Sequence, residues 1–181
     1  MKLQTMHLSP AEAASKKDQV VSVYRAVYSV SPYEEDETQI ERFSTSWTSR
    51  TRMPGFIFSG VVAEKNELVG LAYGWRSVPG DSWNEKLTEQ LGLESRKWLE
   101  DCFEFVDLAV DPRYQGQGLG KELLTSLFEK VTQRTAILLT HQSVTTASRM
   151  YLKQGWIEVK RDFEVSPGKL YQIMGKELRK S

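Results

Sequence analysis

The sequence predicts an α/β (α+β) fold, in which a mixed sheet carries helices on both of its faces. Two observations predict it: apolar strand patterns form hairpins in the first half and at the end of the chain, and a strand–helix–strand succession lies between them. That central β-α-β piece needs a crossover connection, which makes its two strands parallel. At 181 residues the chain is long enough for one core, so we expect a single domain over residues 1–181.

The first part of the chain predicts an edge strand, two helices and a hairpin. Pro10 suits the first position of a helix, because its φ is fixed and its missing N–H is not needed there, and Pro32 ends that helix. Lys65-Asn66 separates two apolar strands. The expected elements are strand 2–8, helix 10–30, helix 35–48, strand 56–64 and strand 67–76.

The second part opens with a helical insertion at about 78–100 and then alternates strands with helices. Asp111-Pro112 ends a strand, Gly155 suits the C-cap of a helix, and Ser166-Pro167-Gly168 turns the last hairpin. The expected elements are a helix over 83–99, strand 103–110, a helix from the Gly-rich loop at 115–120 through about 132, strand 135–141, helix 145–154, and strands 156–165 and 169–178.

Composition argues against several classes of protein. Lys plus Arg equals Asp plus Glu, 24 each, so no global charge points to nucleic acid or to a membrane surface. No apolar run approaches the roughly 20 residues of a membrane span, and the N-terminus lacks a signal-peptide pattern. Cys102, His7 and His141 are too few for a dedicated metal site or a disulfide. We therefore expect a cytoplasmic protein with no metal.

The most informative stretch is a strand that runs through Gln-Gly-Gln-Gly-Leu-Gly into an amphipathic helix. Gly116, Gly118 and Gly120 permit φ > 0 and remove side chains from the inner face of the turn. The free N–H groups of the turn and of the helix start then converge on an anion, for which a pyrophosphate is the natural occupant. The alternative is a Gly-rich turn that only lets strand and helix pack closely.

Two nucleotide-binding motifs do not fit this turn. The dinucleotide fingerprint G-x-G-x-x-G fails because Lys121 stands three positions after Gly118. The P-loop motif fails because Gln115 stands where its first glycine belongs and Glu122 replaces Ser or Thr. A nucleotide-binding module is therefore disfavoured.

The acetyl-CoA signature Q/R-x-x-G-x-G/A does fit, and a second block, A-x-x-x-Y-x-x-x-G-F, follows it with Trp in place of Phe. The matching residues are Val110-Asp111-Pro112 before the turn, Gln115, Gly118 and Gly120 in it, and Ala147, Tyr151, Gly155 and Trp156 in the second block. With both blocks in order, the chain resembles the GNAT superfamily of acetyl-CoA-dependent N-acetyltransferases. The resemblance implies a mostly antiparallel six- to seven-stranded sheet whose central β-α-β motif binds acetyl-CoA. It also implies direct transfer of the acetyl group to a primary amine of a small molecule or peptide.

The resemblance implies roles for individual residues. Tyr151 matches the tyrosine that gives a proton to the departing thiolate; the alternative is a core aromatic between Met150 and Leu152. The backbone of Leu108, Ala109 and Val110 would pair with pantetheine. The residues that would wrap the pyrophosphate are Gln115, Gly116, Gln117, Gly118, Leu119, Gly120 and Lys121.

The attacking amine must lose a proton, so a base or a proton-conducting water is needed. Glu104 stands where some GNAT enzymes place a catalytic glutamate, and Asp107 is the alternative. Either carboxylate can instead lie on a solvated strand edge. Val144 stands where the family often has a pantetheine-binding Asn, a contact that Thr145 or Thr146 would have to replace.

On the acceptor side, 34–37 is an acidic run that either attracts cationic amines or only starts a helix. Trp47, Tyr73, Trp75 and Trp83 either wall an acceptor pocket or pack in the core. Aminoglycosides, polyamines, amino acids and protein N-termini stay open as acceptors, and a homodimer stays open as the assembly. The runner-up function is a non-catalytic acyl-CoA-binding sensor or regulatory domain.

Overall fold

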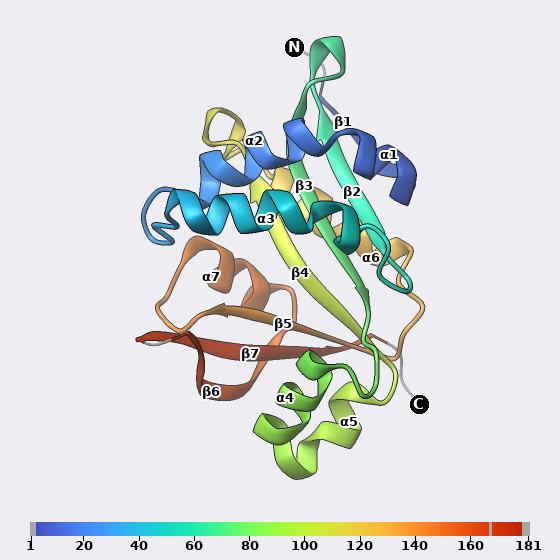
Figure 1. The fold of residues 1–181 in the computed structure, drawn as a ribbon, viewed down its shortest axis with the longest axis vertical. Coiled ribbons are helices and arrows are strands. Elements are labelled where there is room, and N and C mark those ends of the chain that lie inside the picture. The colour runs from blue at the N-terminus through green and yellow to red at the C-terminus, as the bar shows by residue number, and fades with distance from the viewer. Residues whose placement is uncertain (1–2, 167, 179–181) are drawn as a thin grey trace. The chain divides into compact units, whose positions relative to one another are not determined.

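The computed structural model describes residues 3–166 and 168–178, and its elements follow the expected order (Figure 1). The strands are β1 (Gln4–Leu8), β2 (Ile57–Val62), β3 (Leu68–Arg76), β4 (Cys102–Val110), β5 (Thr135–His141), β6 (Ile157–Ser166) and β7 (Lys169–Glu177). The α-helices are α1 (Pro10–Ser15), α2 (Lys17–Tyr28), α3 (Glu37–Arg50), α4 (Ser82–Leu91), α5 (Ser95–Leu99), α6 (Leu119–Glu129) and α7 (Thr146–Lys153).

The strands are ordered β1-β2-β3-β4-β5-β7-β6. The pairs β1–β2, β2–β3, β5–β7 and β6–β7 are antiparallel, and β4–β5 is parallel. This confirms the predicted mixed, mostly antiparallel sheet with a β-α-β unit at its centre. The chain forms two compact units: unit 1 is Met1–Gly74 with Asp107–Val131, and unit 2 is Trp75–Val106 with Thr132–Ser181.

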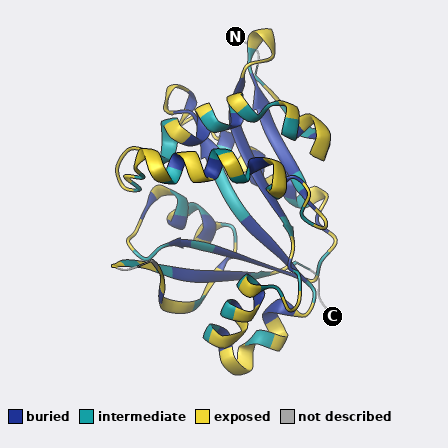
Figure 2. Ribbon diagram, in the orientation of Figure 1, coloured by how far each residue is buried: buried dark blue, intermediate teal, exposed yellow. Residues whose placement is uncertain are grey.

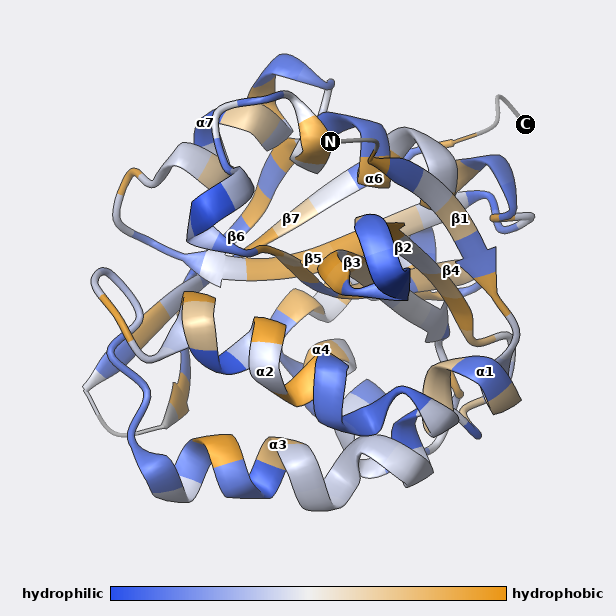
Figure 3. Cartoon of the chain, turned by 90° about the horizontal axis from the view of Figure 1, so that it is seen from above, coloured by the Kyte–Doolittle hydropathy of each residue, from blue (hydrophilic) through white to orange (hydrophobic). Residues whose placement is uncertain are grey.

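In unit 1, helices cover both faces of β1–β3. A Cβ on Gly70 of β3 would lie 3.2 Å from Leu123 of α6, so this face of the strand packs closely on that helix. Tyr73 lies an odd number of residues further along β3 and therefore on the opposite face, where its ring meets Trp47 of α3 edge-on at 5.1 Å. Figures 1 and 3 show α2 and α3 on one side of these strands and α6 on the other.

The expected helix 10–30 is two helices, which corrects the prediction. Ser9 caps α1 through a capping box with Glu12, and the helix ends at Lys16, whose φ and ψ are −91° and 18°. The break has a packing reason: α1 contacts β1 and β2, whereas α2 contacts α3 through a buried face that includes Val20 and Tyr24.

In unit 2, the segment 78–100 folds as two helices with Gly92 between them at φ +54°, where one helix was expected. The core of the unit combines buried side chains of these helices with those of the strands: Leu87, Leu91, Trp98 and Leu99 from the helices, and Cys102, Ile137, Phe163 and Ile173 from the strands. A Cβ on Gly175 of β7 would lie 2.5 Å from the ring of Trp98, so α5 packs directly on the backbone of that strand. Figure 2 shows the same pattern, with buried residues on the strands and exposed ones on the outer faces of α4 and α5.

Within the described residues, no helix combines the length and the apolar character that a bilayer crossing requires.

Candidate active site

The Gly-rich turn lies in unit 1 between β4 and α6, and its inner face is open. Gly116 and Gly118 have φ of +76° and +83°, and a Cβ on either would meet no atom within 4 Å. Gly120 is different: it lies in the first turn of α6 and is not among the positive-φ glycines, so its expected left-handed conformation is wrong. At this position glycine therefore differs from other residues only in lacking a side chain.

Gly118 is the N-cap of α6, and no side chain caps this helix. The N–H groups of an uncapped first turn carry partial positive charge and point along the helix axis, which suits an anion. The side chain of Leu119 is buried, whereas Gln117 and Lys121 are exposed. The Gln115 side chain donates to the carbonyl of Val110 at 2.8 Å and ties the turn to the end of β4.

The end of β4 presents backbone groups at the outer edge of unit 1. Asp111 N–H donates to Val69 O of β3 at 2.9 Å, so by alternation the backbone groups of Val110 and Leu108 face away from β3. Consistent with this, the Leu108 carbonyl accepts a hydrogen bond from the Tyr28 hydroxyl at 3.3 Å. Ala109, the third predicted pantetheine residue, has its backbone directed toward β3.

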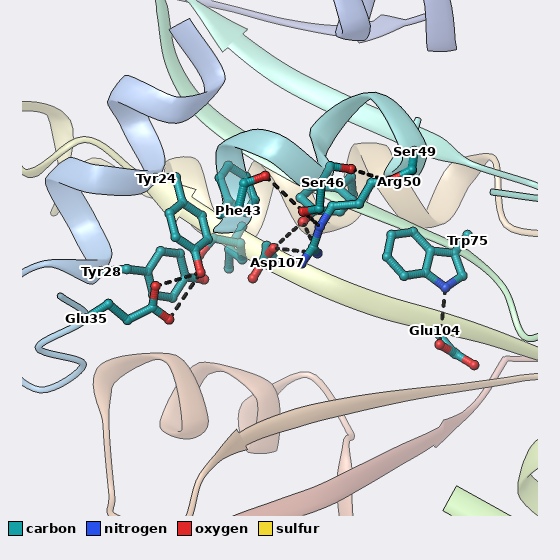
Figure 4. A network of polar contacts seen from close by, with 12 residues as sticks. Tyr24, Tyr28, Glu35, Phe43, Ser46, Ser49, Arg50, Trp75, Glu104 and Asp107 are labelled. Carbon is teal, nitrogen blue, oxygen red and sulfur yellow. Dashed lines mark hydrogen bonds and ion pairs between the residues drawn. The ribbon is translucent and has the colours of Figure 1, made fainter. Parts of the chain in front are cut away.

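Asp107 lies in unit 1 among partners that engage its carboxylate. The Tyr73 hydroxyl donates to it, and the Arg50 guanidinium lies 3.8 Å from the same oxygen. Arg50 in turn donates to Tyr73 and to Ser46, both at 2.9 Å, as it reaches from α3 toward Asp107 (Figure 4). Burial raises the pKa of Asp107, while Arg50 and the hydrogen bond from Tyr73 oppose that rise. This carboxylate is built into an ion pair, which weakens it as a base candidate.

Glu104 lies in unit 2, three residues earlier on β4, and only 6% of it is exposed. The Trp75 indole N–H donates to its carboxylate at 3.2 Å (Figure 4). Burial raises the pKa of Glu104, hydrogen bonds from Ser77 and Trp75 lower it, and the charge of Asp81 raises it, with a net rise. A buried carboxylate with neutral donors and a raised pKa is a suitable proton acceptor.

Tyr151 lies on α7, also in unit 2, and only 6% of it is exposed. Its ring meets Phe105 edge-on at 6.0 Å and lies 6.1 Å from Trp156. Phe105 is the neighbour of Glu104 on β4, and neighbouring strand residues point to opposite faces. The structure therefore brings Tyr151 and Glu104 to the same stretch of β4 from its two sides.

Several other candidates have structural partners. The Thr145 hydroxyl accepts from Ser148 N as the N-cap of α7, so its oxygen is engaged at the start of that helix. His141 stacks on Tyr171 with centroids 4.7 Å apart, and burial lowers its pKa. Trp47 and Tyr73 are fully buried, as core packing predicts.

The acidic run largely starts a helix. Asp36 is the N-cap of α3 in a capping box with Gln39, and Glu37 pairs with Arg25. Glu35 differs, because its carboxylate accepts from the Tyr24 hydroxyl at 2.9 Å, next to the tyrosines of α2 (Figure 4). Within residues 3–166 and 168–178, no three His, Cys, Asp or Glu side chains are arranged to hold a metal ion.

Comparison with known proteins identifies the family of this chain. The model of the Acetyltransferase (GNAT) family matches residues 18–156, which include both predicted sequence blocks. The chain belongs to the GNAT acetyltransferase family. This membership supports the activity of an acetyl-CoA-dependent acyltransferase.

Relatives of this GNAT acetyltransferase support the fold. The GCN5-like protein acetyltransferase Rv2170 of Mycobacterium tuberculosis is 26% identical over 123 residues, which cover 61% of the chain and 59% of that relative. PaiA N-acetyltransferase from Thermoplasma acidophilum, solved with coenzyme A, superposes with a TM-score of 0.64 at 17% identity, covering 98% of this chain and 99% of that one. The putative acetyltransferase YncA from Salmonella typhimurium, solved with acetyl-CoA, gives 0.68 at 16% identity, covering 100% and 96%.

Sequence reasoning missed the partners of Glu104 in this acetyltransferase. No sequence pattern paired Trp75 or Ser77 with Glu104, or Asn84 with Ser77. Ser77 and Asn84 are buried in the structure, and single-sequence patterns do not show the burial of polar groups, so the sequence carries no signal for these contacts.

Proposed function

We propose that this GNAT acetyltransferase moves the acetyl group of acetyl-CoA to a primary amine of a small molecule or peptide by direct attack. The observation that carries the proposal is Glu104, a buried carboxylate on β4 with two neutral donors and a raised pKa. Such a group takes a proton from an ammonium ion more readily than an ordinary surface glutamate does.

In the proposed reaction the ammonium gives a proton to Glu104, and the neutral nitrogen attacks the thioester carbonyl. The C–N bond forms, the C–S bond breaks, and Tyr151 gives its hydroxyl proton to the departing thiolate. Of the two protons that the nitrogen loses, one leaves through Glu104 and the other restores Tyr151. Atoms and charge balance without a metal or a redox step.

The cosubstrate would be held by the chain's own backbone. The N–H groups from Gly116 to Lys121 would take the pyrophosphate, and the outer-edge backbone groups of Leu108 and Val110 would pair with pantetheine. The open space at Gly116 and Gly118 supports this assignment, because a side chain there would occupy the concave face.

The test of the proposed function is release of free CoA from acetyl-CoA across a panel of amines. The panel contains polyamines, aminoglycosides, amino acids and peptides with free N-termini or lysines. We expect amine-dependent release with at least one class of acceptor, together with an acetylated product of matching mass. Tight acetyl-CoA binding without release on any acceptor would favour the non-catalytic sensor instead.

Gly118→Val is expected to weaken acetyl-CoA binding by about 10–100-fold, since a β-branched residue at this φ costs on the order of 1–3 kcal/mol and projects toward the pyrophosphate. Calorimetry measures the affinity. The matched control is Gly80→Val, at φ +82° and with equally open surroundings, but in the segment before α4. Unchanged affinity in Gly118→Val, or an equal loss in Gly80→Val, would contradict the phosphate role.

Glu35→Gln tests the acceptor side. If Glu35 attracts cationic amines, its neutralisation should raise KM for a polyamine about fivefold at low salt, the effect of roughly 1 kcal/mol of exposed Coulomb attraction, with kcat unchanged. The difference should shrink when the Debye length falls below about 10 Å. Glu37→Gln is the control, because that carboxylate pairs with Arg25. An unchanged KM for Glu35→Gln at low salt would leave the acidic run with a purely structural role.

A further inference from the structure

Two donors on one strand hold Glu104. Trp75 and Ser77 are two residues apart on and just after β3, so their side chains project to the same face. Trp75 donates its indole N–H to the carboxylate at 3.2 Å, and the Ser77 side chain also hydrogen-bonds Glu104. The Ser77 backbone is fixed in turn, because its N–H donates to Cys102 O at 2.9 Å.

Ser77 has a further partner on the first turn of α4. The side-chain amide of Asn84 donates to the Ser77 hydroxyl at 2.9 Å, and Asn84 and Ser77 are only 7% and 4% exposed. The Asn84 backbone is also anchored, since its N–H donates to the Asp81 carboxylate that caps the helix, at 2.7 Å. The amide is therefore held in position by the start of the helix.

The chemistry of a hydroxyl gives this chain a direction. A serine hydroxyl has one proton to donate and lone pairs to accept with, whereas an amide NH₂ group only donates. Because Asn84 donates to the oxygen of Ser77, the serine proton points elsewhere, and the Glu104 carboxylate, whose pKa the Ser77 side chain lowers as a hydrogen-bond partner, is its acceptor in this inference. Asn84 thereby orients a donor toward the carboxylate without touching it.

We propose that Asn84 is a positioning residue for Glu104 and acts through Ser77, so that the helical segment 78–100 takes part in acetyl transfer. The inference rests on the proposed role of Glu104 as the base. All four residues of the relay (Asn84, Ser77, Trp75 and Glu104) lie in unit 2.

The relay predicts the direction in which the pH dependence of kcat/KM changes when one of its donors is removed. Donors stabilise the ionised carboxylate, so losing one raises the pKa of Glu104 and moves the acidic limb of kcat/KM to higher pH. Two other titratable groups are coupled to Glu104. The charge of Asp81, at the α4 N-cap, raises the pKa of Glu104, and the charge of Glu104 raises the pKa of the Cys102 thiol on β4. The Cys102 pKa is raised by burial and then by Glu104, so this thiol stays neutral through the acidic limb, and Asp81 is left unchanged in every variant.

The experiment is a double-mutant cycle of Ser77→Ala and Asn84→Ala, read from pH profiles of kcat/KM. We expect the acidic limb to rise by about one pH unit in Ser77→Ala and by about half a unit in Asn84→Ala, in line with the effect of single hydrogen bonds on carboxyl pKa values. In the Ser77→Ala background, Asn84→Ala should add nothing, because its effect passes through the serine. Additive shifts would overturn the relay.

A second readout does not depend on activity. The carboxyl ¹³C resonance of Glu104, assigned by its loss in Glu104→Gln, should titrate with the same upward shifts in each variant. Asn84→Asp keeps the volume and the backbone of Asn84 but replaces the donor with an acceptor and a charge, so its shift should be the largest. Thr88→Ala, on the exposed side of α4, is the control and should shift neither readout.

The outcomes separate the two claims. An unchanged limb and an unchanged carboxyl pKa in both Asn84 variants, with the limb lost in Glu104→Gln, would overturn the role of Asn84 alone. A limb that persists in Glu104→Gln would overturn the proposed base and, with it, the catalytic meaning of the relay.

Discussion

Replacing Tyr151 by phenylalanine is expected to lower kcat by about 10²–10⁴-fold, the usual contribution of a positioned general acid, with acetyl-CoA affinity nearly unchanged. The substitution keeps the ring and therefore its packing against Phe105 and Trp156. Only the hydroxyl proton is removed, so an effect confined to kcat points to proton transfer.

Steady-state and single-turnover kinetics with the best acceptor measure this effect. Tyr171→Phe is the matched control, since it removes a hydroxyl from another tyrosine of unit 2, one that stacks on His141. If Tyr151→Phe retains wild-type turnover while chemistry limits the rate, Tyr151 is a core aromatic, as its small exposure also permits.

Glu104→Gln is expected to lower kcat/KM by about 10²–10⁴-fold and to abolish the acidic limb of its pH profile. The sign follows from the base role: Glu104 accepts a proton only when ionised, so activity rises as pH passes through its pKa. Because burial raises that pKa above the ordinary 4.5, the wild-type limb should lie above this value. Glutamine keeps the volume and can still accept from Trp75, so loss of packing is a small part of the effect.

Asp107→Asn is the comparison that separates the two β4 carboxylates. The substitution removes the ion pair with Arg50 and the charged acceptor of the Tyr73 hydroxyl, so we expect lower thermal stability. The acidic limb of the kcat/KM profile should be retained. A limb lost in Asp107→Asn and kept in Glu104→Gln would reverse the assignment.

Local patterns account for what the sequence predicted well. The Gly-rich turn is recognisable because its backbone requirement is met by residues within a few positions of one another, and the structure places positive φ at Gly116 and Gly118. The strands and the β-α-β crossover follow from hydrophobic periodicity, which is also local. The break at Lys16 was missed because no Pro or Gly interrupts residues 11–31, and only the separate packing of α1 and α2 divides them.

Contacts between distant segments account for what the sequence did not predict. The choice between Glu104 and Asp107 depends on which side chains face each carboxylate across the sheet, and strand pairing decides that. Arg50 comes from α3, Ser77 follows β3, and Asn84 comes from α4 in the insertion. Neither periodicity nor a motif places these residues beside β4. The sequence left the role of the acidic run 34–37 undecided for the same reason. Only tertiary contacts distinguish Glu35, which accepts from the Tyr24 hydroxyl, from Asp36, which caps α3.

The buried position of Cys102 has a practical consequence for assays of this enzyme. It is the chain's single cysteine, it is 1% exposed, and burial raises its pKa, so little reactive thiolate is present at neutral pH. A disulfide reagent that reports free thiols by colour should therefore register the released CoA with almost no background from the folded protein. By the same reasoning, a cysteine introduced at an exposed position would take a maleimide dye at one defined place on the molecule.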